Sequence, residues 1–133
     1  MPTNECVPFF KPGRDITGIP EADLGGKRFV APVHVDGNRG SQPHINYPAA
    51  GKPACGVLGR DAVAGDPVHF NVGGTVPVVA GSDITAGSLV MTDAQGRAVP
   101  FAAVAAPAFN APLGLATTNA VAGASVAVQL NLG

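Results

Sequence analysis

The sequence predicts an all-β protein, a compact small β-barrel with an extended N-terminal arm. Short β-branched runs alternate with Gly-centred turns from residue 52 onward, which is typical of short strands joined by tight turns. Gly and Pro number 18 and 13 among the 133 residues. Pro100 and Pro107 bound the main Ala-rich stretch, and the residues between them are too few for a stable helix.

Residues 1–50 are expected to form the arm. Prolines and glycines recur along this segment, so regular structure in it should be short, since Pro lacks a backbone donor and Gly is costly to order. Arg28–Val35 is the exception, and Pro32 predicts that this strand lies at a sheet edge. Residues 51–133 are expected to form the β domain.

Seven strands are expected within residues 51–133. The last of them alternates most clearly, with Val126, Val128 and Leu130 on one face and Gln129 on the other. A β-turn is expected at Asp93–Gly96. The predicted strands are Cys55–Leu58, Val68–Val72, Thr75–Val79, Ser88–Thr92, Ala98–Phe101, Leu113–Ala116 and Ser125–Leu132.

The β domain contains an internal repeat. Gly56–Phe70 aligns with Gly114–Val128 at a constant displacement of 58 residues, and Asp83–Val90 is a weaker third copy. The shared pattern, [Asp/Asn]-x-x-Ala-Gly-x-x-Val, predicts an Asx-type turn, a Gly with positive φ and a following strand. The copies could be repeated binding loops, but we interpret them as recurring corners of a barrel.

Charge is scarce and unevenly placed. Charged residues make up 13% of the chain, against about 25% in a typical soluble domain, and none follows Arg97. A net charge of −1 without a basic block excludes nucleic acid and anionic membranes as partners, and prolines interrupt residues 98–133 too often for a membrane span. We therefore expect the neutral segment to pack in a core or against neighbouring subunits, although a tolerated neutral surface would also explain it.

No catalytic, cofactor or metal site is expected. The sequence lacks a Gly-x-Ser-x-Gly elbow and both Gly-rich phosphate-binding patterns. Glu21 and Asp23, the close pair of carboxylates, lie in the predicted arm, where burial is not expected. His34, Asp36 and His44 could form a weak metal site, but their spacing matches no zinc pattern and solvated edge residues are the preferred interpretation.

The two cysteines and the first residues give no redox or secretion signal. Cys6 and Cys55 belong to no Cys-x-x-Cys motif and are expected to be free thiols, with Cys55 buried. No cationic segment followed by an apolar stretch opens the sequence, so no signal peptide is predicted.

A family pattern runs through Gly73–Pro100, which contains Val78-x-x-Gly81, Ile84-x-x-Gly87-x-x-Val90 and Asp93-x-x-Gly96. With Pro112–Ala116 and Ala122–Leu130, this segment resembles the head decoration proteins of tailed bacteriophages, also called capsid cement or minor capsid proteins. The resemblance covers residues 52–133. It implies a β-barrel or β-clip-like domain, usually a homotrimer, on the outside of a capsid, with the major capsid protein as partner and no catalytic or ligand residues.

Two apolar groups are candidates for the assembly interface. Phe9 and Phe10 lie in an arm that cannot bury enough surface to order alone, so we expect them to dock on a neighbouring subunit or the capsid, although a disordered tail is an equal alternative. The other group is Val126, Val128 and Leu130 on the last predicted strand.

The sequence therefore predicts a structural virion protein, made in the bacterial cytoplasm, that decorates and stabilises a phage capsid through many subunit contacts. The alternative is a receptor- or carbohydrate-binding module of a phage fibre or tail. Such modules use Trp and Tyr platforms, whereas this chain has no Trp and a single Tyr, Tyr47. A small enzyme or regulatory subunit is disfavoured by the missing catalytic groups.

Overall fold

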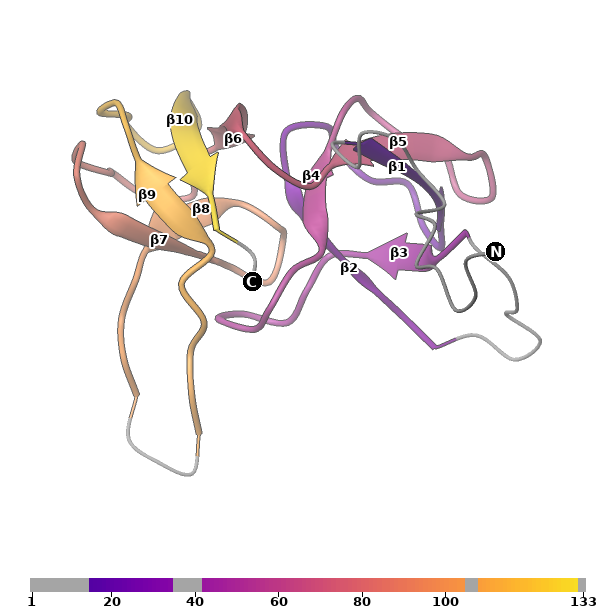
Figure 1. The fold of residues 1–133 in the computed structure, drawn as a ribbon, viewed down its shortest axis with the longest axis horizontal. Helices are drawn as coiled ribbons and strands as arrows, with labels where there is room; N and C mark the ends of the chain where they lie inside the picture. Colours follow the sequence, from indigo (N-terminus) through magenta and orange to yellow (C-terminus); the bar gives the residue numbers. More distant parts are fainter. Residues whose placement is uncertain (1–14, 35–41, 105–107, 132–133) are drawn as a thin grey trace, which may run out of the picture.

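A computed structural model describes residues 15–34, 42–104 and 108–131 of the chain. Ten strands form two five-stranded units that lie side by side (Figure 1). The first unit contains β1 (Asp15–Pro20), β2 (Phe29–Pro32), β3 (His44–Asn46), β4 (Gly56–Leu58) and β5 (Val68–Asn71). The second contains β6 (Thr75–Val79), β7 (Leu89–Thr92), β8 (Ala98–Pro100), β9 (Gly114–Ala116) and β10 (Ser125–Leu130).

The two units share one topology. The first is a closed barrel in the order β1-β3-β2-β4-β5, in which β1 and β3 are parallel and the other pairs are antiparallel. The second has the order β6-β10-β9-β7-β8, and a single parallel bridge between Ala80 and Ala98 takes the place of the β1–β3 pair. The predicted all-β class and small barrel are confirmed.

All eight strands expected from the sequence are present, and most are shorter than predicted. The prediction of an extended arm over residues 1–50 is wrong for its described part, because β1, β2 and β3 belong to the barrel. β2 is also not an edge strand, since it pairs with both β3 and β4. In β1, Gly18 lies against Phe70 and Ile45, where an added Cβ would come within 3.0 to 3.2 Å of their side chains.

Reciprocal turns hold each unit together. In each unit, two copies of the repeat face one another, and the Asp or Asn of each copy accepts a hydrogen bond from a backbone N–H of the other. These side-chain caps pair backbone N–H groups at the corners that the strand ladders do not use. The bonds are Ala64 N to Asp23 Oδ1 (3.0 Å), Gly26 N to Asp61 Oδ1 (2.8 Å), Ala122 N to Asp83 Oδ1 (3.1 Å) and Ala86 N to Asn119 Oδ1 (2.7 Å).

The four turns also share one backbone conformation. The residue four positions after each Asp or Asn has a positive φ: 58° at Lys27, 84° at Gly65, 89° at Gly87 and 87° at Gly123. The interpretation of the repeat as strand-turn-strand corners is confirmed. Because a fourth copy begins at Asp23, the repeat extends through both units, and the described chain is an internal duplication.

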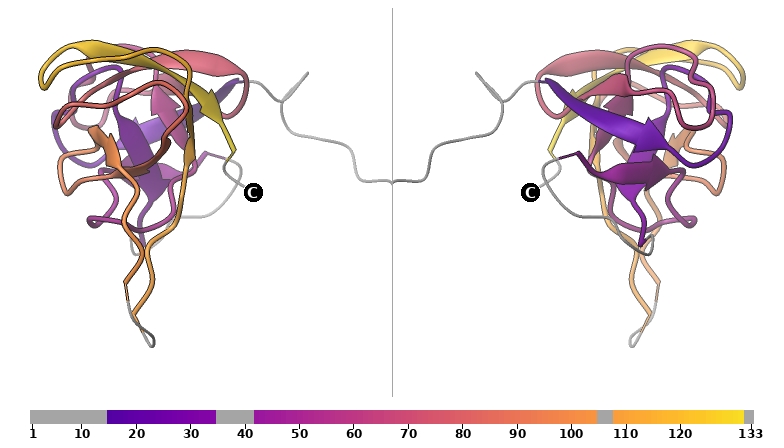
Figure 2. Two further views of the ribbon diagram at one scale, coloured as in Figure 1. Left: turned by 90° about the vertical axis from the view of Figure 1, so that its left-hand side faces the viewer. Right: turned by 90° about the vertical axis from the view of Figure 1, so that its right-hand side faces the viewer.

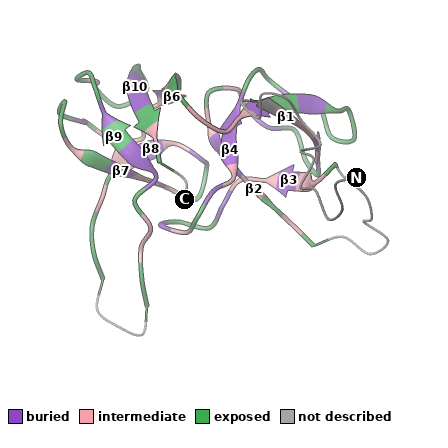
Figure 3. Cartoon of the chain, in the orientation of Figure 1, coloured by how far each residue is buried: buried purple, intermediate pink, exposed green. Residues whose placement is uncertain are grey.

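The units share the wall formed by β2 and β4. Successive side chains of a strand point to opposite faces, so Val30 and Leu58 pack inside the barrel while Phe29 and Val57 pack into the core of the second unit. All of β4 is buried as a result (Figure 3). Phe29 N also donates to Gly96 O of the second unit at 2.7 Å.

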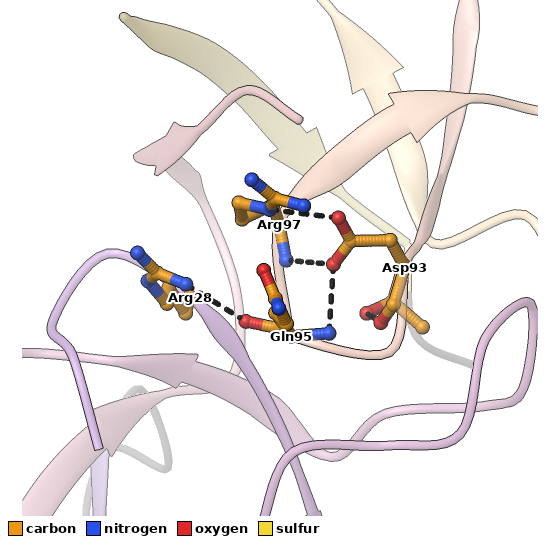
Figure 4. A network of polar contacts seen from close by, with 5 residues as sticks. Arg28, Asp93, Gln95 and Arg97 are labelled. Atoms are coloured by element: carbon orange, nitrogen blue, oxygen red, sulfur yellow. Dashed lines mark hydrogen bonds and ion pairs between the residues drawn. The ribbon is translucent and has the colours of Figure 1, made fainter. Parts of the chain in front are cut away.

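We call the contact between the two units, in which the wall of β2 and β4 packs on the second unit, the joint. The turn between β7 and β8 makes polar contacts at this joint (Figure 4). Asp93 Oδ1 accepts hydrogen bonds from Gln95 N and Arg97 N, both at 2.9 Å, and Arg97 Nε donates to Asp93 Oδ2 at 2.8 Å. The turn presents Gln95 O to Arg28 Nη1 of the first unit at 3.1 Å. The β-turn predicted at Asp93–Gly96 is confirmed by the bond from Gly96 N to Asp93 O.

We expect Val128→Asp to destabilise the protein by about 3–5 kcal/mol, because it places an unpaired charge in the core. Val128 is 0% exposed, whereas its neighbour Gln129 is exposed. Denaturant unfolding followed by circular dichroism measures the effect, with Gln129→Asp as the matched control. Equal stability of the two variants would contradict the assignment of Val128 to the buried face of β10 and of Gln129 to its exposed face.

We expect Gly123→Ala to lower the free energy of unfolding by about 1–2 kcal/mol through backbone strain alone. An added Cβ at Gly123 meets nothing within 4 Å, so no clash contributes. Gly73→Ala is the control, because its Cβ would also enter open space and its φ is not positive. The same unfolding measurement should show no loss of stability for Gly73→Ala. Equal losses of stability in the two variants would contradict a destabilisation caused by the positive φ.

Candidate assembly surfaces

The structure separates the predicted interface residues. Val126 and Val128 are fully buried in the core of the second unit of the same chain, so their assignment to an assembly interface is wrong. Alternation along β10 identifies the apolar face but does not tell whether that face meets its own core or a neighbour. Leu130 is half-buried and remains at a surface. Phe9 and Phe10 lie outside the described residues.

Leu130 lines an open groove formed by residues of β7, β9 and β10 and by Pro112 and Asn131 beside them. The groove has a volume of about 490 Å³. Leu89 and Leu115 face each other across the β7–β9 register and are 48% and 37% exposed, which is unusual for two adjoining leucines. The lining residues are Leu89, Pro112, Gly114, Leu115, Gln129, Leu130 and Asn131, none of which is charged.

A long hairpin projects from the second unit between β8 and β9, well away from the body of the molecule (Figures 1 and 2). Its described residues include two exposed apolar side chains, Val104 and Phe109, the latter 56% exposed. The root is fixed on the first unit, since Ala111 N donates to Gly51 O at 2.8 Å. Lys52 Nζ donates to Phe109 O at 2.9 Å and lies 4.4 Å from the centroid of the Phe109 ring.

The titratable side chains are mostly used in structural contacts. His44 Nδ1 lies 2.5 Å from Glu21 Oε2, while Asp36, the third member of the weak metal site considered above, lies outside the described residues. In the described ranges, no three His, Cys, Asp or Glu side chains gather as metal ligands would. Burial raises the pKa of the free Cys55 thiol to about 11, so it is not a reactive thiolate near neutral pH.

Over the same ranges, no helix has the length and apolar character needed to cross a bilayer.

Comparison with known proteins agrees with the resemblance seen in the sequence. Residues 15–132, which include both units, match the model of a family described as phage cement protein. The chain belongs to the phage cement protein family. It is therefore a structural protein of the virion that decorates the capsid.

The fold also matches a solved structure, the head fiber gp8.5 N base of bacteriophage phi29. The two share 24% sequence identity with a TM-score of 0.69, over 90% of this chain and 94% of that chain. Both units are therefore included in the similarity. No curated protein sequence matches this cement protein.

Sequence reasoning missed Leu89, Leu115 and Phe109 as surface residues. Leu89 and Leu115 lie in predicted strands, and a strand pattern alone does not show which of its apolar side chains stays uncovered. A signal was nevertheless present. Asp83–Val90, read as a third copy of the repeat, also aligns with Asp23–Val30, and that match reveals the duplication.

Proposed function

We propose that this cement protein binds the major capsid protein as a homotrimer and stabilises the shell without any catalytic activity. The observation that supports the capsid contact is the projecting hairpin with exposed Val104 and Phe109. The head decoration proteins that the sequence resembles are usually trimers, which supports the proposed homotrimer.

The hairpin is suited to an apolar, uncharged contact. Its residues follow Arg97, after which the chain carries no charge, so the described part of the hairpin brings no charged side chain of its own to the contact. Lys52 holds Phe109 by its carbonyl and its ring, which limits the freedom lost on binding. Burying a Phe side chain contributes about 1.5–3 kcal/mol, and several copies on one lattice bind with the advantage of multivalency.

An uncharged contact should also respond weakly to salt. Screening weakens interactions between exposed charges but leaves apolar burial intact. We therefore infer a capsid affinity that changes little with ionic strength, unlike that of a protein held by surface ion pairs.

Phe109→Ser should weaken capsid binding by at least about tenfold, because it removes one buried side chain from each copy of a multivalent contact. Occupancy is measured by co-sedimentation with capsids that lack the protein, together with the thermal stability of the loaded capsids. Val63→Ser is the control, since Val63 is an exposed valine on a turn of the first unit.

Equal occupancy by Phe109→Ser, Val63→Ser and the unchanged protein would contradict the hairpin as the capsid contact. Binding to host cells without binding to capsids would instead favour the receptor-binding alternative. The folded state of each variant is checked by circular dichroism, which excludes a loss of binding through unfolding.

A further inference from the structure

The internal duplication gives the strands of the second unit counterparts in the first. Leu89 and Leu115 are paired across β7 and β9, as Phe29 and Val57 are paired across β2 and β4. The displacements between counterparts, 60 and 58 residues, are those of the reciprocal turns. Leu89 therefore corresponds to Phe29, and Leu115 corresponds to Val57.

The counterpart residues differ in what covers them. Phe29 and Val57 are 0% and 1% exposed, because the second unit packs over them and includes them in its core. Ala54 belongs to the same core, and its counterpart, displaced by 58 residues, is Pro112 of the groove. The part of the groove formed by Leu89, Leu115 and Pro112 thus corresponds to the joint between the units, and among the described residues no third unit covers it.

We propose that a second copy of this chain covers the groove, so that the exposed leucines Leu89 and Leu115 form a self-association surface, with the half-buried Leu130 beside them. This inference rests on the self-association in the proposed function and names the surface that performs it. The groove's correspondence to the joint supports a second copy as the occupant, since the corresponding face of the first unit is covered by another five-stranded unit of the same fold.

The composition of the groove supports the same occupant. Its lining has three leucines, no charged residue, and the polar side chains Gln129 and Asn131. Interfaces between identical subunits are more apolar than the remaining protein surface and avoid charge at their centre. Two adjoining leucines open to water would otherwise favour non-specific association.

The second copy must use a different surface from the one that forms the joint. Within each chain, the Asp93–Arg97 turn already docks on the first unit through Gln95 O and Gly96 O. It is therefore not available to cover the groove of a neighbour. Association through the groove adds a new contact and leaves the joint unchanged.

The test is the molar mass of the free protein in the absence of capsids. The unchanged protein and Leu115→Asp are compared by sedimentation equilibrium over a range of concentrations, with circular dichroism to confirm the fold. Because Leu115 is exposed at 37%, the variant does not bury its new charge in the subunit core. Leu89→Asp, at a more exposed position, serves as a second variant should Leu115→Asp fail to fold.

The unchanged protein should associate, and either groove variant should dissociate at least about a hundredfold more readily, since each oligomer contact loses a leucine and gains a desolvated charge. Val121→Asp is the matched control, because Val121 is an exposed valine outside the groove lining, and it should associate like the unchanged protein.

A monomeric unchanged protein would overturn the inference, and so would a groove variant that associates normally. Loss of capsid binding by Leu115→Asp, with the unchanged protein monomeric, would show that the capsid covers the groove and would also overturn it. A protein that associates through the groove but binds no capsid would support this inference and contradict the proposed capsid partner. The two proposals can therefore fail separately.

Discussion

The burial of β2 and β4 on both faces is the constraint on which the rest of the structure depends. A strand in a small barrel usually has one face in the core and one in water, and so needs only every second residue to be apolar. Here Val30 and Leu58 fill the barrel while Phe29 and Val57 enter the second unit. The shared wall joins two units that would each bury little surface alone, and small cores are marginal.

The reciprocal turns explain how strands of three to six residues form a stable barrel. Short strands supply few ladder hydrogen bonds, so the corners must pair their own backbone groups. An Asp or Asn side chain at each corner provides an acceptor, and the positive φ four residues later turns the chain. Lys27 adopts this conformation without being Gly, at the position where the chain enters the shared wall.

The fold class and most strands could be predicted because they are encoded locally. Thr75–Val79 and Ser125–Leu130 show the β-branched content and alternation that packing on one face requires. β1 and β3 could not be predicted, since Gly18 and the short segment His44–Asn46 become strands only through partners distant in sequence, β5 and β2. A Gly that fits beneath the Phe70 ring looks like a turn residue when that ring is unknown.

The candidate assembly surfaces were harder to predict, because they depend on how whole units pack and not only on which strands pair. Phe9 and Phe10 lie outside the described residues, so their docking remains a prediction. Val128 and Leu115 are both apolar strand residues, yet Val128 is fully buried and Leu115 is not. The difference depends on which face another unit covers, and that is a property of the arrangement of the units. Only the internal duplication allows the sequence to indicate which strand face another unit covers.

The two units differ in how many charged side chains they carry and in whether those side chains are already paired. Within the described part of the second unit, the charged residues are Asp83, Asp93 and Arg97, and each is already engaged: Asp83 caps the opposite turn, and Asp93 pairs with Arg97. A surface without unengaged charge can be buried against a neighbour without the cost of desolvating ions. The first unit carries most of the remaining charge, including Lys52 at the root of the hairpin.

This division makes the two proposed contacts compatible. The groove and the hairpin meet at Pro112, so a neighbour seated in the groove lies next to the hairpin root without needing the exposed Phe109 ring. Self-association would bring several hairpins to one assembly, and each would then bind the shell at a high effective concentration. A cement protein built in this way gains affinity from the number of hairpins that bind together, so no single hairpin contact has to be strong.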